Sequence, residues 1–370
     1  MSFIIRGIGT AVPQHFAMQD ELAGLAHGLA GPGGREDRTL KVLYRKSGVD
    51  KRHFTVLDSE AGPLEERQSF YDPAPAPGHE GPTTAVRMAR FETDAPPLAA
   101  QAARAALAEA GWNAADITHL VTVTCTGFFA PGLDAVLRDT LGLPRDVHRT
   151  QVGFMGCHGS MNGLRVASSF TGADPDARVL VASVELCSLH LAYGSDPDDL
   201  VANVIFGDGA AAVVGTGVGT SGPGASRPDG AWTVAANGTY LLPDSADAMS
   251  WRIGNHGFRM TLSARVPDLI QTHLEGWLRE WLAAQGLSME DVASWAVHPG
   301  GPRILTAVED ALGLERVASV VPRQILSEFG NMSSATILFI LQRMRMQGAP
   351  LPLVGLAFGP GLVVEAVLVR

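Results

Sequence analysis

Short apolar runs alternate with longer amphipathic segments along most of the chain. Four runs rich in β-branched residues predict buried strands: 2–8, 119–124, 178–183 and 209–214. Three segments with apolar residues at helical spacing predict helices: 98–111, 133–141 and 161–170. Strands that alternate with helices in this way are typical of an α/β sheet covered by helices.

The same alternation returns after the glycine-rich stretch 215–230, which has no periodicity and predicts a linker. The second half predicts, in order, a strand near Trp232, a helix at 266–285, a strand at 294–297, a helix at 304–312 and a strand pair at 353–369. We therefore expect a pseudo-duplicated α/β chain with halves at 1–225 and 226–370. The stretch 58–97 is rich in proline, glycine and acidic residues and is expected to supply little core.

The composition is that of a folded protein, with 46% hydrophobic and 18% charged residues in a chain of 370. A net charge of −10 argues against nonspecific binding to nucleic acid or anionic membranes, because such a field repels phosphate. The start of the chain does not resemble a signal peptide, and no apolar stretch reaches the roughly 20 residues that span a bilayer. Three widely spaced cysteines suggest neither a disulfide framework nor a zinc site, so we expect a cytoplasmic protein.

The segment GFMGCHGSMNGLRVA places Cys157 between small residues, directly before an apolar helical pattern. At a helix N-terminus, free amide groups and the helix dipole stabilise a thiolate, so Cys157 is a candidate nucleophile. Taken alone, the alternative of a buried structural cysteine is favoured, because free cysteine is commonly a small core residue.

Two further segments carry candidate chemistry. In WAVHPGGP, His298 ends an apolar strand and is placed to act as a base or as a partner to a thiolate. In FGNMSSA, Asn331 precedes an apolar helix, where it is either an ordinary N-cap or a donor to a developing oxyanion. Each segment alone is better explained as structural.

Taken together, GCHGSMNGLRVA, HPGGP and GNMSSA resemble the Cys-His-Asn set of the chalcone synthase family, the type III polyketide synthases among the thiolase-like condensing enzymes. GIGTAVP, FGDGAAA, VPDLI and FGPGL are similar to family motifs too, so the resemblance spans nearly the whole chain. It implies a thiolase-like, pseudo-duplicated five-layer αβαβα fold and a homodimer.

The resemblance also implies the chemistry. Cys157 would be acylated by a starter thioester and held as a thiolate by an ion pair with His298. His298 and Asn331 would hydrogen-bond the thioester oxygen of malonyl-CoA while CO₂ leaves, and the enolate would attack the Cys157 thioester. The substrates are acyl-CoA and malonyl-CoA, and no metal or other cofactor is expected. Phe206 matches a gatekeeper position, although a plain core aromatic is the alternative.

The remaining cavity residues carry the expectation about substrate. Met260 stands where the family has a second gatekeeper phenylalanine, Cys125 and Cys187 where plant members have hydroxyl residues, and Ala130 where a methionine reaches into the partner subunit. Ser333, in GNMSSA, is expected to line the same cavity. Small and flexible residues predict a roomy, apolar cavity. We therefore expect an aliphatic starter and a pyrone or resorcinol product, as in alkylpyrone and alkylresorcinol synthases.

All three lysines of the chain lie within eleven residues, at Lys41, Lys46 and Lys51. The family binds the phosphates of CoA with basic residues of an early helix, and Lys46 matches that pattern, with Lys41 and Arg303 as further candidates. Gly300 and Gly301 would let the backbone approach the ligand closely. An acyl carrier protein is a possible starter donor. The alternative is a solvated helix face.

Two other functions compete with iterative condensation. An initiating ketoacyl synthase would perform one condensation with an acyl carrier protein. A non-catalytic thiolase-like scaffold would need none of the three candidate catalytic residues.

Overall fold

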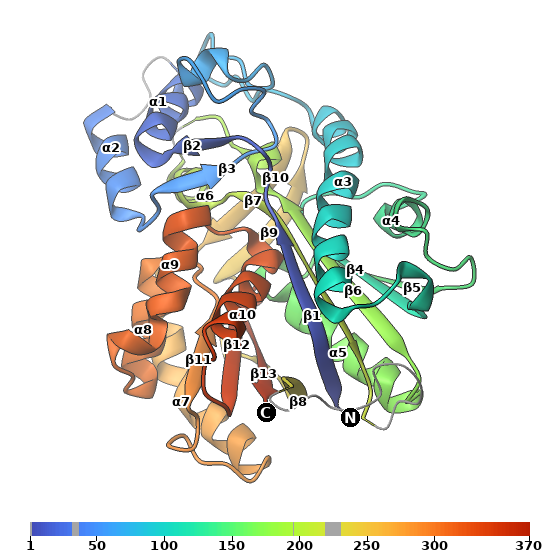
Figure 1. Cartoon of the computed structure of the whole chain (residues 1–370). Coiled ribbons are helices and arrows are strands. Elements are labelled where there is room, and N and C mark those ends of the chain that lie inside the picture. Colours follow the sequence, from blue (N-terminus) through green and yellow to red (C-terminus); the bar gives the residue numbers. More distant parts are fainter. Residues whose placement is uncertain (1, 32–36, 195, 219–230) are drawn as a thin grey trace.

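The computed structural model describes residues 2–31, 37–194, 196–218 and 231–370, and its centre is one mixed sheet (Figure 1). Its strands run in the order β11 (Ser294–Val297), β12 (Leu353–Gly359), β13 (Val363–Val369), β8 (Thr233–Leu241), β1 (Phe3–Ala11), β7 (Asp208–Thr216), β6 (Arg178–Leu186), β4 (His119–Thr124) and β5 (His148–Gly153). β4 is parallel to β5 and β6, and β11 is parallel to β12, whereas the other neighbours are antiparallel. β8 joins the strands of the two halves.

Helices cover this sheet in layers. α3 (Thr84–Ala110) packs on the outer face of β1, β6 and β7, while α7 (Val266–Ala283) and α8 (Pro302–Leu312) cover the opposite outer face. α5 (Gly159–Ala173) and α10 (Thr336–Met346) lie buried between the two parts of the sheet (Figure 1). This arrangement confirms the expected thiolase-like five-layer αβαβα fold.

The strand sequences account for the layers, because successive side chains point to opposite faces. Leu120 of β4 joins the cluster under α3, whereas its neighbour Val121 joins the cluster around α5 and α10. In β12, Leu353 faces the central helices and Val354 faces α7 and α8. Strands buried on both faces read as the nearly continuous apolar runs seen in the sequence.

Several elements have the predicted bounds, including β4, β11 and α4 (Leu133–Leu141). The prediction for 58–97 is wrong in its second part, because α3 begins at Thr84 and contains Pro96 and Pro97. The buried face of this helix extends toward its N-terminus through Ala95 and Phe91, about one turn for each residue. Packing of this face stabilises the helix more than the backbone hydrogen bonds lost at the two prolines destabilise it. The predicted division at residue 225 lies outside the described residues and stays a prediction.

Smaller elements surround one end of the sheet. Two helices, α1 (Gln19–Ala30) and α2 (Asp37–Lys46), lie beside the strand pair β2 (Phe16–Met18) and β3 (Lys51–His53). The others are α6 (Pro197–Ile205), α9 (Val320–Phe329) and the hairpin of β9 (Met249–Gly254) and β10 (Gly257–Leu262). No helix in the described ranges is long and apolar enough to cross a membrane.

Candidate active site

Cys157 lies in a short 3₁₀ turn, Gly156–His158, that leads directly into α5. Gly156 has a φ of +71°, and a Cβ there would stand 2.6 Å from the Cδ atom of Pro360, so both its conformation and its surroundings require glycine. The candidate nucleophile thus lies directly before the N-terminus of a buried helix, as the sequence predicts.

Asn331 follows α9 and reaches the same place from the other half of the chain. Its side-chain Oδ1 accepts a hydrogen bond from the amide of Ser333 at 2.8 Å, which leaves Nδ2 pointing at the Sγ of Cys157 from 3.9 Å. Its backbone pairs with Ile205 and Gly207. Asn331 is therefore not the N-cap of the apolar helix α10, whose N-cap is Ala335. One side of its amide holds the turn and the other faces the candidate nucleophile, and its role as an oxyanion donor stays a prediction.

His298 follows β11, and its backbone amide donates to the carbonyl of Leu356 at 2.8 Å. The side chain is buried, yet neither ring nitrogen has a hydrogen-bond partner among the described residues. Burial lowers the pKa of His298 to about 3, and the neighbouring His158 adds to this effect. An imidazole without fixed partners can accept a proton from a substrate or from a thiol.

Burial also dominates the charge state of Cys157. It raises the pKa of the thiol to about 11, although hydrogen bonds from Ser333 and Asn331 act in the opposite direction. Because the pKa of His298 is lowered at the same time, burial favours a neutral thiol and a neutral imidazole. The expected ion pair therefore has to form against the cost of desolvation.

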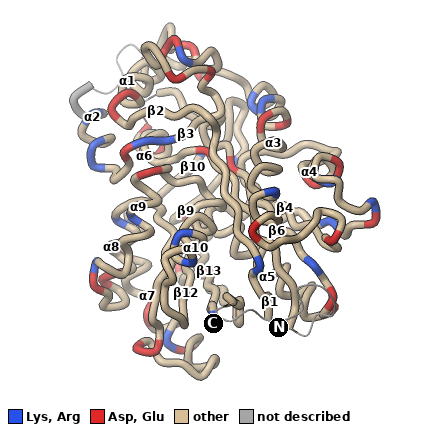
Figure 2. Tube along the Cα trace, viewed as in Figure 1, with Lys and Arg blue, Asp and Glu red and all other residues tan. Residues whose placement is uncertain are grey.

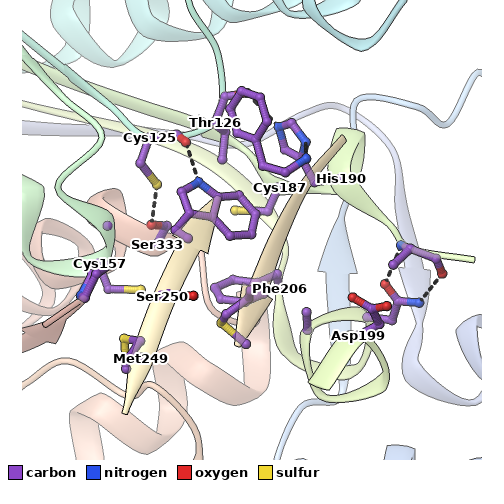
Figure 3. A pocket seen from close by; sticks show the side chains of 18 of the residues that line it. Cys125, Thr126, Cys157, Cys187, His190, Asp199, Phe206, Met249, Ser250 and Ser333 are labelled. Carbon is purple, nitrogen blue, oxygen red and sulfur yellow. Dashed lines mark hydrogen bonds between the residues drawn. The ribbon is translucent and has the colours of Figure 1, made fainter. Parts of the chain in front are cut away.

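An apolar cavity of about 50 Å³, partly open to solvent, is lined in part by Cys157 (Figure 3). Six predicted residues line it: Cys125, Cys157, Cys187, Phe206, Met260 and Ser333. In the close-up, Cys157 and Asp199 lie toward opposite ends of the lining. The chain thus brings all three of its cysteines to one cavity.

Cys125 and Cys187 behave as wall residues. The Sγ of Cys125 lies 3.2 Å from the Oγ of Ser333, and its amide donates to the buried carboxyl of Glu185. Burial and the nearby Glu185 raise the pKa of both thiols well above its usual value, so neither carries a thiolate at neutral pH.

Trp251 is the main lining residue that the sequence analysis missed. It comes from β9, and its indole Nε1 donates to the carbonyl of Cys125 at 2.8 Å. Its ring makes edge contacts with His190 and Phe258, which stack on each other with ring centres 4.2 Å apart. The hairpin therefore fills part of the space expected to be roomy. The alternating pattern of the hairpin could have predicted its strands, but the sequence does not indicate which face of the hairpin lines the cavity.

Ala130 does not line the cavity of its own chain, and its expected place at the cavity of a partner subunit stays a prediction. It is exposed, because the preceding phenylalanines take the inward positions: Phe128 contacts Phe154 and Phe258, and Phe129 contacts Phe91.

The basic residues lie outside the cavity. Lys46 and Arg303 are exposed. The loop after α2 approaches the start of α8, since a Cβ on Gly48 would stand 3.0 Å from the Cγ of Pro302. Basic positions follow α2 and β3 in Figure 2. Gly301 has a φ of +149°, which glycine adopts readily. The structure thus brings the lysine segment to the HPGGP turn, although none of Lys41, Lys46, Arg303, Gly300 or Gly301 lines the cavity.

Comparison with known proteins identifies the family of the chain. Residues 2–220 match the N-terminal domain of chalcone and stilbene synthases, and residues 233–370 match the C-terminal domain. A 1,3,6,8-tetrahydroxynaphthalene synthase of Streptomyces peucetius subsp. caesius is 38% identical over 99% of this chain and 92% of its own. The alpha-pyrone synthesis polyketide synthase-like Pks18 of Mycobacterium tuberculosis is 33% identical over 99% of this chain and 90% of its own.

Among solved structures, PKS-I of the brown alga Ectocarpus siliculosus superimposes with a TM-score of 0.87 at 32% identity, covering 100% of this chain and 98% of the other. Both halves of the chain and its whole fold are accounted for by one family. The chain belongs to the chalcone and stilbene synthase family and is a type III polyketide synthase, an acyl-transferring condensing enzyme.

Proposed function

We propose that the enzyme condenses malonyl-CoA repeatedly onto an acyl starter held on Cys157 and cyclises the chain to a pyrone or resorcinol product. The observation that carries this proposal is the meeting of Cys157 and Asn331 at one end of an apolar cavity, with the buried ring of His298 free of partners. CoA thioesters are the substrates.

In the loading step, His298 takes the proton of the Cys157 thiol, and the thiolate attacks the starter carbonyl. The thiolate of CoA leaves and receives that proton. This assignment fits a site in which both groups start neutral. A base within the site is required, because burial leaves about one thiol in ten thousand ionised at pH 7 when the pKa is about 11.

In the extension step, malonyl-CoA loses CO₂ and the enolate oxygen accepts hydrogen bonds from Asn331 and His298. The enolate carbon attacks the Cys157 thioester, a carbon–carbon bond forms, and the Cys157 thiolate leaves. The amide of Asn331 is held by Ser333 before substrate arrives, so it donates without reorganisation. Repetition of loading and extension lengthens the chain.

The starter is proposed to be an aliphatic acyl group. Cys125, Cys187, Met249 and Met260 give the cavity a flexible, sulfur-rich wall, and Phe206 and Trp251 bound it with aromatic faces. One relative is named for a naphthalene product and another for alpha-pyrone synthesis, so the family accommodates different chains. The phosphates of CoA are proposed to rest on Lys46, Lys41 and Arg303.

The direct experiment supplies the purified enzyme with malonyl-CoA and a panel of starters, from C4 to C16 acyl-CoAs to coumaroyl-CoA, and identifies products by mass. We expect aliphatic products carrying two or more malonyl units. Much faster turnover of coumaroyl-CoA would contradict the aliphatic starter. A single extension without a ring would indicate an initiating ketoacyl synthase instead.

The partners are also proposals. A second copy of the chain is proposed to pair with this one, with β5 at the sheet edge and the exposed Ala130 as the supporting features. An acyl carrier protein could deliver the starter in place of CoA. Sedimentation of the purified enzyme tests the dimer, and loading of Cys157 from acyl carrier protein against acyl-CoA tests the donor.

A further inference from the structure

A second histidine stands beside the candidate catalytic pair and is part of neither the acylation nor the extension step. His158 directly follows Cys157 and is 2% exposed. Its ring lies against the end of β12: a Cβ on Gly359 would stand 2.2 Å from its Cδ2 atom and 2.6 Å from its Nε2 atom. The ring thus fills the gap between the nucleophile turn and the loop that carries Pro360 into the cavity wall.

A hydrogen-bonded chain runs from this ring into the C-terminal half. The Nδ1 of His158 lies 2.7 Å from the Oδ1 of Asn162, one turn along α5. The Nδ2 of Asn162 donates to the Oε1 of Glu365 on β13 at 3.0 Å. Glu365 is buried, also accepts a hydrogen bond from Thr239 of β8, and forms an ion pair with Arg165.

This series of hydrogen bonds fixes the tautomer of His158. Glu365, as a carboxylate, can only accept, so the amide of Asn162 must turn its nitrogen toward Glu365 and its oxygen toward His158. The oxygen in turn requires a hydrogen on Nδ1 of the histidine. A neutral His158 therefore carries its proton on Nδ1 and a lone pair on Nε2.

We propose that His158 is a positioning residue for the condensation, held as the Nδ1–H tautomer by Asn162 and Glu365 so that an uncharged ring braces the Cys157 turn beside His298. The inference rests on the proposed function, since it assigns a role toward the same catalytic pair. His158 ties a turn of the N-terminal half to strands of the C-terminal half, which supplies His298 and Asn331.

The charged and titratable groups around His158 determine its pKa and the effect of its protonation on His298. Glu365 is linked to His158 through Asn162, and Arg165 comes from its own helix. Cys157 precedes His158 in the chain, and His298 lies close enough for its pKa to respond to His158. Burial lowers the pKa of His158, Asn162 raises it, and Arg165 lowers it. A positive charge on His158 repels a positive charge on His298 and so lowers the pKa of His298. Protonation of His158 therefore makes His298 a weaker proton acceptor. Acid should therefore switch off the proton transfer from Cys157.

The test combines one measurement without substrate and one with it. In the intact enzyme labelled with ¹⁵N-histidine, we expect the His158 ring to show its hydrogen on Nδ1, and Asn162→Leu to lose that preference. For turnover, Asn162→Asp adds a carboxylate that raises the pKa of His158, so the acid limb of kcat should move at least one pH unit upward. Asn162→Leu should not move it upward.

His158→Phe keeps the ring that packs on Gly359 and removes the titrating group, so its acid limb should move downward by at least half a unit. Ser168→Ala is the matched control, because it removes a buried hydrogen bond to Leu164 on the same helix without touching the chain to Glu365, and its profile should stay that of the wild type. If Asn162→Asp does not fold, His158→Phe carries the test.

A wild-type His158 with its hydrogen on Nε2 would overturn the inference, and so would acid limbs that coincide in the wild type, Asn162→Asp and His158→Phe. Neither result would touch the proposed function, which depends on product formation from acyl-CoA and malonyl-CoA.

Discussion

Replacing Trp251 by alanine should lengthen the preferred starter. The indole is pinned by its hydrogen bond to the Cys125 carbonyl and by edge contacts with His190 and Phe258, so it cannot swing aside for a longer chain. Alanine would open space next to a wall made largely of apolar atoms. A starter that buries three more methylenes there gains about 0.8 kcal/mol of binding free energy for each methylene. In Trp251→Ala, such a starter should therefore be preferred roughly 50-fold over one that lacks those three methylenes.

The assay is kcat/KM across acyl-CoAs from C4 to C16, with malonyl-CoA saturating and products identified by mass. We expect the optimum of Trp251→Ala to lie at least two carbons above that of the wild type. Trp251→Phe is the control, since it keeps an aromatic wall while it loses the donor and only part of the ring volume. An unchanged optimum in Trp251→Ala would refute the reasoning, because it would mean that the acyl chain runs elsewhere.

Four other changes test separate parts of the site. Asn331→Ala should lower malonyl-CoA decarboxylation about 10²- to 10³-fold while acylation of Cys157 by the starter persists, measured by CO₂ release and intact mass. Because the Cys157 pKa is raised to about 11, its alkylation by iodoacetamide should rise about tenfold per pH unit from pH 7 to 9, and a flat profile would indicate a standing ion pair. Gly359→Ala forces a Cβ into a histidine ring and should cost about 1–3 kcal/mol in denaturant unfolding. Neutralising Lys46 and Lys41 together should raise KM for malonyl-CoA with kcat nearly unchanged, and an equal KM would return these lysines to a solvated face.

The strands and helices of the core could be predicted because their patterns are local. Runs such as 119–124 and 294–297 are rich in apolar residues and are buried on both faces, as the layers of the fold require. The start of α3 could not be predicted, because Pro96 and Pro97 break the local signal and only tertiary packing of Phe91 restores the helix.

The site shows the same division. Cys157, His298 and Asn331 stand in motifs with conspicuous glycines, so the sequence displays them. Close contacts require Gly156 beside Cys157 and Gly330 beside Asn331, and Gly301 near His298 has a φ of +149°. Trp251 stands in ordinary surroundings, whereas His158 directly follows Cys157 in a motif that does not show its partners. Trp251 donates to the carbonyl of Cys125, and His158 reaches Glu365 through Asn162, so both are linked to residues more than a hundred positions away. Only the folded chain makes those contacts visible.

The two buried helices have a consequence for how this acidic protein handles anions. α5 is preceded by the turn that carries Cys157, and α10 by the turn Ser333–Ala335 just after Asn331, and these two turns are in contact. Each helix presents the equivalent of about half a positive charge at that end. Peptide groups, rather than lysines or arginines, thus supply the positive field where a thiolate and an enolate form. A protein with a net charge of −10 can therefore still stabilise anionic intermediates, because backbone peptide groups supply the positive potential at the site.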